Sequence, residues 1–179
     1  MKNASHNAPK SFSELIRPHL ERMYRLAYRL TGNQHDARDL IQDVMLKLYP
    51  KKDELTEVDA LIPWLAKVVY RQFVDTRRRY AVRHLHIVAD SEFASNPDNA
   101  AAIQVSTEDQ VEAEFTVARL GTAVASLSEE HRLIIYLHDV EGYTISEIAE
   151  ITEVPRGTVK SRRQRARDRL QELLRKGPE

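Results

Sequence analysis

The chain has 179 residues, of which 42% are hydrophobic and 30% charged, and its formal net charge is zero. It contains no cysteine, which excludes a disulfide framework and a cysteine-based zinc site. We expect a soluble, cytoplasmic protein without membrane insertion, because the first ten residues are too polar for a signal peptide and no apolar run is long enough to span a bilayer. The few glycines and the scarcity of period-two alternation favour an all-α fold.

The zero net charge hides an uneven distribution along the chain. Residues 1–85 carry 16 Lys and Arg against 10 Asp and Glu, residues 86–114 carry none against 7, and residues 155–176 carry 9 against 2. Two basic segments on either side of an acidic one are typical of a nucleic-acid-binding protein with a separate acidic linker. A chance distribution of surface charge is the alternative, and only the sequence motifs can distinguish it from nucleic-acid binding.

A first small helical domain is predicted at residues 11–83. Its first helix begins at a capping box, Ser11-x-x-Glu14, and its last helix has Pro63 in the first turn, where proline is tolerated. The predicted helices cover residues 11–30, 34–49 and 63–83, with a stop at 31–33 and a polar loop at 51–59.

The predicted helix at residues 34–49 has an apolar face and an acidic face. The acidic side carries Asp36, Asp39, Gln42 and Asp43. Such a carboxylate stripe, backed by a full core face, suggests docking on a basic protein surface. A helix face that is simply solvated would give the same pattern.

The predicted helix at residues 63–83 mixes aromatic and basic side chains. Aromatic rings can stack on exposed bases while cations neutralise phosphates, as in proteins that bind single-stranded DNA. Taken singly, Trp64 and Phe73 fit a hydrophobic core better. The residues concerned are Trp64, Tyr70, Phe73 and Tyr80 with Lys67, Arg71, Arg77, Arg78, Arg79 and Arg83.

A flexible acidic linker is predicted at residues 84–111, and a second helical domain at 112–175. The linker region has no Lys or Arg and is rich in Ala, Ser, Asn and Asp. In the second domain, Ser128 is a predicted N-cap and Thr144-x-x-Glu147 a capping box. The helices are expected at about 112–126, 129–140, 144–151 and 155–175.

The last two of these helices are predicted to form a helix-turn-helix. The second of them carries seven Lys or Arg and a single acid between Arg156 and Arg169. So many cations on one short helix would repel one another without an anionic partner, so we expect this helix to enter the major groove of DNA. Its apolar side is expected to pack on the preceding helix. That side carries Val159, Ala166, Leu170 and Leu173, and the partners are Ile145, Ile148 and Ala149.

The opposite side of this helix is the predicted DNA-reading surface. Arg can bond guanine bidentately, and Ser or Thr suits phosphate. Arg162, Arg167 and Arg169 are expected at the sides, where they can reach phosphates. The helical wheel turns Arg163 inward, which would require its stem to snorkel along the core or the helix to rotate slightly.

We predict no catalytic residue, no metal site and no cofactor. No His or Glu is expected to complete an acid–base or metal site beside the carboxylates of the helix at 34–49. His84-x-His86 has no further ligand at a suitable spacing, so a surface pair is the better interpretation. An enzyme is therefore not expected.

In their order along the chain, these motifs resemble the extracytoplasmic-function (ECF, group four) sigma factors of bacterial RNA polymerase. Asp36-Ala37-x-Asp39-Leu40-x-Gln42-Asp43 is similar to the family's polymerase-docking helix. Trp64-Leu65 with Asp75-x-x-Arg78-Arg79 is similar to its −10 segment. Glu147-Ile148-Ala149 and Gly157-Thr158-Val159-Lys160-Ser161-Arg162-x-x-Arg165-Ala166-Arg167 are similar to its −35 reader. The resemblance covers about residues 12–83 and 113–174, and departs at Arg71 and Arg163, where the family usually has Asn and Leu or Ile.

The resemblance implies a promoter-recognition subunit with a region-two-like domain at 11–83 and a region-four-like domain at 112–175. Its implied partners are core RNA polymerase, promoter DNA and commonly an inhibitory anti-sigma factor. It assigns polymerase docking to Asp36, Asp39, Gln42 and Asp43, and −35 recognition to Arg156, Thr158, Lys160, Ser161, Arg162, Gln164 and Arg165. It assigns −10 contacts to Lys51, Lys52, Trp64, Lys67, Arg71, Asp75, Arg78 and Arg79, with the loop at 51–59 capturing a flipped base.

Two other functions fit parts of the sequence. An ordinary helix-turn-helix regulator would bind duplex DNA without polymerase, but its sensor domain would need neither the acidic helix nor the aromatic-basic helix. A decoy that binds polymerase or an anti-sigma factor, with degenerate DNA contacts, is kept open by Arg71 and Arg163. Promoter-dependent transcription with core enzyme separates the three.

Overall fold

The computed structural model describes residues 11–85 and 118–176. The chain divides into two compact units, residues 1–89 and 90–179. The described residues of both units form helices and turns and contain no strand, which confirms the all-α prediction. None of the described helices combines the length and the apolar character needed to cross a membrane.

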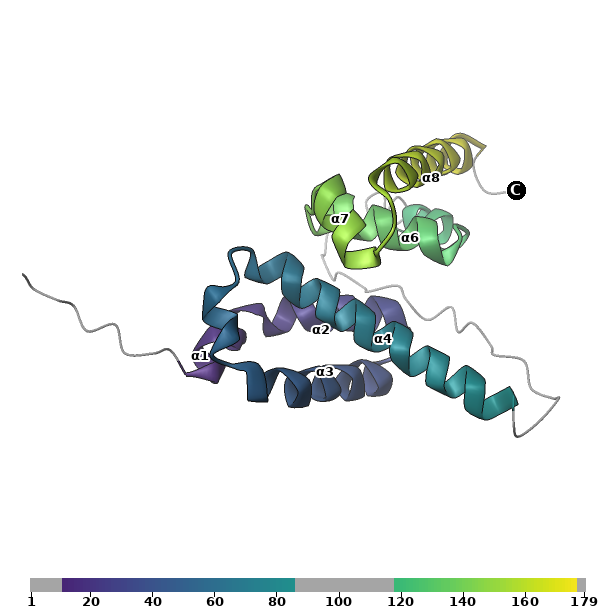
Figure 1. Cartoon of the computed structure of the whole chain (residues 1–179). Helices are drawn as coiled ribbons and strands as arrows, with labels where there is room; N and C mark the ends of the chain where they lie inside the picture. Colours follow the sequence, from purple (N-terminus) through teal and green to yellow (C-terminus); the bar gives the residue numbers. More distant parts are fainter. Residues whose placement is uncertain (1–10, 86–117, 177–179) are drawn as a thin grey trace, which may run out of the picture. The chain divides into compact units, whose positions relative to one another are not determined.

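The first unit is a bundle in which α2, α3 and α4 pack against one another (Figure 1). Its core contains apolar residues from each of these helices, including Leu26, Val44 and Val69. The C-terminal part of α4 extends past the ends of α2 and α3, so it presents side chains outside the bundle. The elements are α1 (Phe12–Ile16), η1 (Arg17–His19), α2 (Leu20–Thr31), α3 (Gln34–Leu48), η2 (Tyr49–Lys51), η3 (Glu54–Glu57) and α4 (Leu61–Leu85).

The predicted start and end of the first helical segment are confirmed, but the segment is interrupted. The Ser11 hydroxyl accepts the N–H of Glu14 at 3.3 Å, and the Glu14 carboxylate accepts the N–H of Ser11 at 2.8 Å, which completes the capping box. Gly32 ends α2 at a φ of 79°, a left-handed conformation that favours glycine. The 3-10 turn η1 divides the segment because Pro18 has no N–H to donate to the preceding helical turn.

The predicted polar loop at residues 51–59 has more structure than expected. The 3-10 turn η2 (Tyr49–Lys51) ends at the first residue of this loop, and η3 (Glu54–Glu57) lies within it. Leu55 is only 2% exposed and anchors the segment in the core of the first unit. The sequence suggested an irregular loop because its two apolar residues, Leu55 and Val58, lie among charged ones.

The second unit is a helix-turn-helix with supporting helices. Both predicted N-caps are confirmed: Ser128 accepts the N–H of His131, and Thr144 forms a complete capping box with Glu147. Glu153, with a φ of 58°, ends α7 and forms the tight turn before α8. The described elements are a helical segment at 118–125, α6 (Glu129–Ile135), a π-helical turn η4 (Tyr136–Val140), α7 (Ile145–Thr152) and α8 (Arg156–Lys176).

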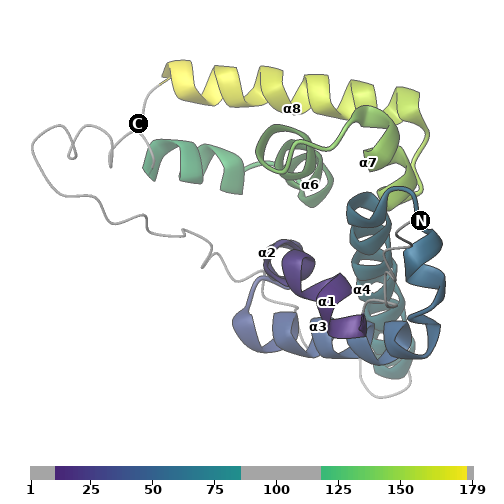
Figure 2. The same ribbon diagram turned by 90° about the vertical axis from the view of Figure 1, so that its left-hand side faces the viewer.

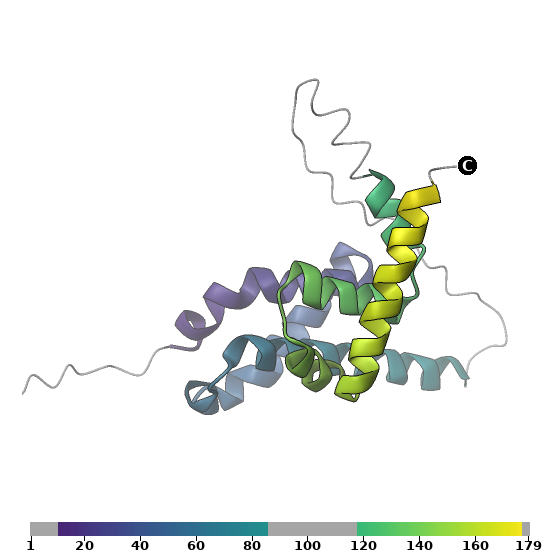
Figure 3. The ribbon, with the colours of Figure 1, turned by 90° about the horizontal axis from the view of Figure 1, so that it is seen from above.

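The apolar side of α8 packs on both α6 and α7. Figures 2 and 3 show α7 beside the N-terminal end of α8, where Val159 and Ile148 are fully buried. From the sequence we predicted that α8 packs on α7 alone, and this prediction was incomplete. Ala166 and Leu170 lie in a cluster with Leu127 and Ile135, because α8 is long enough to reach α6 beyond the helix-turn-helix.

The predicted linker at 84–111 starts too early, because α4 continues through Leu85. Residues 86–111 of the predicted linker lie outside the described residues, as do His86 of the histidine pair and residues 112–117 of the predicted helix at 112–126.

Candidate docking face and nucleic-acid interface

The acidic side of α3 is exposed along its length. Asp36, Asp39, Gln42 and Asp43 all face solvent, while Ala37, Leu40, Val44 and Leu48 on the other side are buried. The structure therefore brings the four predicted docking residues together on one surface, which we call the acidic face.

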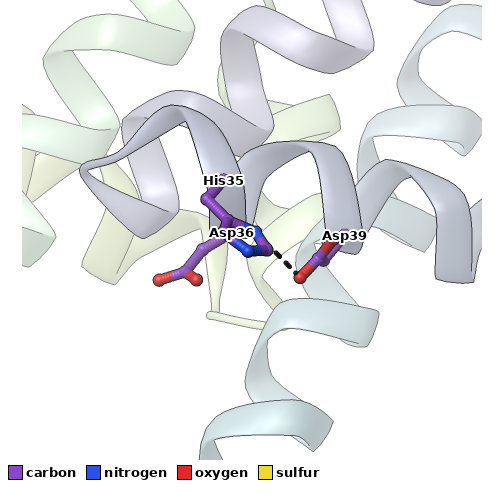
Figure 4. Close-up of side chains that lie close together, drawn as sticks. All are labelled: His35, Asp36 and Asp39. Carbon is purple, nitrogen blue, oxygen red and sulfur yellow. Dashed lines mark ion pairs between the residues drawn. The ribbon is translucent and has the colours of Figure 1, made fainter.

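Two carboxylates of the acidic face are held by residues at the start of α3. The N-cap Asn33 accepts the N–H of Asp36 at 2.8 Å and donates from Nδ2 to the Asp36 carboxylate at 2.7 Å. His35 Nδ1 lies 3.1 Å from Asp39 Oδ2 (Figure 4). Asn33 is uncharged, so its two hydrogen bonds orient the Asp36 carboxylate without cancelling the negative charge of that group.

His35 corrects the expectation that no histidine lies beside these carboxylates. Ligand atoms of His35, Asp36 and Asp39 all lie within 4.8 Å of one another. All three side chains are exposed, and His35 already contacts Asp39. Exposed acidic groups next to a histidine are common on helix surfaces, so this cluster supports no metal assignment.

Asp43 belongs both to the acidic face and to a contact between α3 and α4. Its Oδ2 accepts a hydrogen bond of 2.9 Å from Nε2 of Gln72 in α4. The carbonyl oxygen of the same amide accepts a hydrogen bond from Lys47. Sequence reasoning missed Gln72, although its spacing from Leu65 and Val69 placed a polar residue on the buried side of α4.

The candidate −10 residues of α4 follow one side of the helix. Trp64, Lys67, Arg71, Asp75 and Arg78 succeed one another at spacings of three or four, so they form one stripe. Trp64 and Lys67 are half-buried, and the later members of the stripe are exposed.

The C-terminal part of α4, from Phe73 onward, is basic and partly aromatic. Arg79 is exposed beside the stripe, and Arg77 lies over the ring of Phe73 at 5.6 Å from its centroid. Tyr80 is 54% exposed. Lys51 and Lys52, the other candidates, are exposed at η2. This region combines cations with an accessible ring, the composition that suits an unstacked DNA strand.

On α8, the predicted DNA-reading residues occupy the solvent side. Arg156, Lys160, Gln164 and Arg165 are exposed, and Thr158, Ser161 and Arg162 are half-buried. The Ser161 hydroxyl lies 3.0 Å from the carbonyl of Thr158 and 3.3 Å from Arg165 Nη2. Gln164 donates to Asp168 at 2.8 Å. The surface is therefore ordered by bonds along the helix itself.

The lateral arginines of α8 are all engaged with carboxylates, which the sequence did not predict. Arg162 pairs with Glu130 of α6 at 2.8 Å, and Arg169 pairs with Glu172 at 2.8 Å. Arg167 bonds Asp139 of η4. These carboxylates offset the charge of the three arginines, so a DNA phosphate would compete with them for the guanidinium groups.

Asp139 also explains why Arg163 points inward. Its Oδ1 lies 3.2 Å from Arg163 Nη2, so one carboxylate of η4 holds two arginines of α8. Partial burial raises the pKa of Asp139, but the hydrogen bonds and positive charges of Arg167 and Arg163 outweigh this and hold the pKa below its ordinary value. The arginines lie 24 and 28 residues away in sequence, so no local pattern could have revealed the contact.

These features define a class: a DNA-binding helix-turn-helix protein whose first unit adds an exposed acidic helix and a basic, aromatic helix. Comparisons with known proteins agree. Residues 15–83 match the family Sigma-70 region 2, and residues 118–170 match Sigma-70, region 4. The chain belongs to the ECF sigma factors of RNA polymerase, the initiation subunits that direct transcription from specific promoters.

Curated relatives are similar along most of the chain. The ECF sigma factor SigE of Mycolicibacterium smegmatis is 35% identical over 94% of this chain, which spans 63% of the length of that relative. SigM of Mycobacterium tuberculosis is 32% identical over 92% of this chain and 77% of its own length. SigW of Bacillus subtilis is 27% identical over 92% and 89%, respectively.

Solved structures give the same result for the fold. The sigma factor RpoE of Bartonella quintana, solved in complex with the anti-sigma factor NepR, has a TM-score of 0.66 and 25% identity over 93% of this chain and 98% of its own. CnrH, solved with the cytosolic domain of CnrY, has a TM-score of 0.58 at 19% identity over 93% and 89%, and supports the fold alone.

Proposed function

We propose that this chain binds core RNA polymerase through the acidic face of α3 and reads promoter DNA through α8 and α4. The observation that supports docking most directly is the exposure of all four acidic-face residues over a buried apolar side. Asn33, His35 and Gln72 orient the carboxylates of this face, and the uncharged amides of Asn33 and Gln72 leave their partners a negative charge for a basic surface.

In this proposal α8 binds the −35 duplex. Its N-terminal end and solvent side carry Arg156, Lys160, Gln164 and Arg165 at positions that suit base edges and phosphates. The lateral arginines add phosphate contacts after exchanging their carboxylate partners. The −35 candidates Thr158, Ser161 and Arg162 remain part of the proposed surface.

The stripe on α4 would hold the opened −10 strand, with Lys51 and Lys52 on the neighbouring segment. Binding energy spent on the unstacked strand favours the open form, and the polymerase supplies the chemistry, so the chain itself needs no catalytic group. We place this activity in the cytoplasm, where core polymerase acts. An anti-sigma factor is a further proposed partner, since the related RpoE was solved in complex with one.

The experiment that tests this proposal combines binding and strand opening. The full chain is mixed with bacterial core polymerase and a promoter fragment, and unpaired thymines are mapped with permanganate. We expect a stable complex with core and reactive thymines in the −10 element only when both proteins are present. Duplex binding without core, and no opened bases with it, would instead support a conventional helix-turn-helix regulator.

A further inference from the structure

Gln72 is the one buried polar residue among those that the structure describes, with 3% of its surface exposed. It lies on the core side of α4 with Leu65 and Val69. A buried amide without partners destabilises a fold, so the bonds that satisfy Gln72 restrict how α3 and α4 can pack.

Both ends of the Gln72 amide bond to charged residues of α3. The Nε2 group donates to Asp43 Oδ2 at 2.9 Å, and the carbonyl oxygen accepts from Lys47. Hydrogen bonds to ionised groups are stronger and more directional than neutral ones. The orientation of the amide is therefore set by one negative and one positive partner.

Without this amide, Asp43 and Lys47 would be a favourable ion pair. They are four residues apart on one helix, with the acid on the N-terminal side, which is the better orientation for a direct contact. Gln72 instead bonds each of them, and it uses only one of the two Asp43 oxygens, Oδ2. The contact leaves Asp43 with a carboxylate oxygen for another partner.

We propose that Gln72 is a positioning residue for polymerase docking. It fixes the Asp43 carboxylate on the acidic face and keeps the Lys47 ammonium from neutralising it. Because Gln72 belongs to α4, the same contact ties the docking face to the helix that carries the candidate −10 residues. This inference rests on the proposed function of the acidic face.

The test measures the affinity of the full chain for core polymerase, with the melting temperature of each variant recorded in parallel. Gln72→Met keeps a similar volume but removes the amide, so Lys47 can pair with Asp43. We expect the affinity to fall about threefold, the order of one exposed charge pair. Adding Lys47→Met to Gln72→Met should restore most of the lost affinity. This gain should be larger than the gain in affinity that Lys47→Met causes alone in the otherwise unmodified chain.

That difference between backgrounds separates positioning from a purely structural role. If Gln72 only supported packing, removing a lysine from α3 would not rescue Gln72→Met. Unchanged core affinity in folded Gln72→Met, or equal effects of Lys47→Met in both backgrounds, would overturn the proposal.

A second variant guards against misfolding of Gln72→Met. The exchange Asp43→Lys with Lys47→Asp preserves one charge of each sign. The side-chain amide of Gln72 can rotate by half a turn, so that its N–H and its carbonyl oxygen again face an anion and a cation. We expect a near-normal melting temperature and weakened core binding, because the carboxylate has left its position. Normal core binding by this variant would contradict the proposal.

Asp36→Asn with Asp39→Asn distinguishes failure of this inference from failure of the proposed function. If that variant loses core binding while Gln72→Met does not, docking by the acidic face stands and the role of Gln72 falls. If neither variant loses core binding, the docking face itself is wrong, and the inference falls with it.

Discussion

The acidic face of α3 and the basic side of α8 hold their charges in opposite ways. The carboxylates of α3 are oriented by an asparagine, a histidine and a buried glutamine. The lateral arginines of α8 are instead paired with carboxylates of Glu130, Asp139 and Glu172. The two amides therefore leave carboxylates of the first surface charged for a partner, whereas in the second surface the charge of the lateral arginines is offset by carboxylates of the same chain.

The largest effect that follows from this contrast is expected on α3. Asp36→Asn with Asp39→Asn removes two exposed negative charges from the acidic face, so the affinity for core polymerase should fall by about tenfold or more. The matched control is Glu57→Gln, which removes an exposed acid of η3, off the acidic face, and should bind core normally. Equal behaviour of the two variants in a titration of labelled chain with core would count against docking by α3.

A smaller but clear effect is expected on the solvent side of α8. Arg165→Ala should weaken binding of the holoenzyme to −35 duplex DNA by about tenfold, the usual scale for an arginine that reads bases. Arg169→Ala, in which the lost arginine is already paired with Glu172, should change the affinity much less. If the two substitutions weaken −35 binding equally, the distinction between reading and lateral arginines is wrong.

Loss of the Asp139 carboxylate should affect stability. Asp139→Asn leaves Arg163 and Arg167 without their shared anion, and the Asp139 side chain is only 23% exposed. We expect the free energy of unfolding to fall by about 1 kcal/mol in urea titrations. Asp168→Asn, which changes an exposed acid bonded only along α8, is the control and should have little effect.

The same carboxylate predicts a pH dependence. The pKa of Asp139 is lower in the folded chain than in the unfolded one, so the unfolded state binds more protons as the pH falls. The stabilisation is complete above pH of about 4, the ordinary carboxyl pKa, and is lost as the pH drops through the lower folded value. The difference in stability between the wild-type chain and Asp139→Asn should therefore shrink in acid, and a difference that grows would contradict the assignment.

The smallest expected effect comes from freeing a lateral arginine. Glu130→Gln releases Arg162 from its 2.8 Å ion pair, so one more phosphate contact becomes available without an exchange of partners. The plot of log affinity against log salt for duplex DNA should steepen by up to about 0.9. An unchanged slope would mean that Arg162 does not reach phosphate, with or without Glu130.

The elements that the sequence predicts well are those with local signals. Capping boxes at Ser11 and Thr144, the glycine stop at Gly32 and the periodicity of α3 and α8 all depend on residues a few positions apart. Most of the candidate site residues are exposed and the others are half-buried, because amphipathic spacing separates a surface from a core. Their roles in docking and DNA binding remain predictions.

The contacts that the sequence could not supply join distant positions. Asp139 meets Arg163 and Arg167 only because η4 and α8 pack together, and Gln72 meets Asp43 only because α3 and α4 do. Pro18 and Leu55 are exceptions, because each is a local signal in the sequence, for the interruption of the first helical segment and for the anchored loop respectively. The prediction did not use either of them. Long-range pairing of charges therefore has to be read from the fold.

Run-off transcription tests the central claim most directly. Core polymerase is incubated with fragmented genomic DNA of the source organism, with and without the purified chain, and new transcripts are mapped at their 5′ ends. We predict transcripts that depend on the chain and share one −35 and −10 pair upstream of their starts. Specific binding of the chain to duplex DNA, with no new transcript in the presence of core, would contradict its assignment as a promoter-directing subunit.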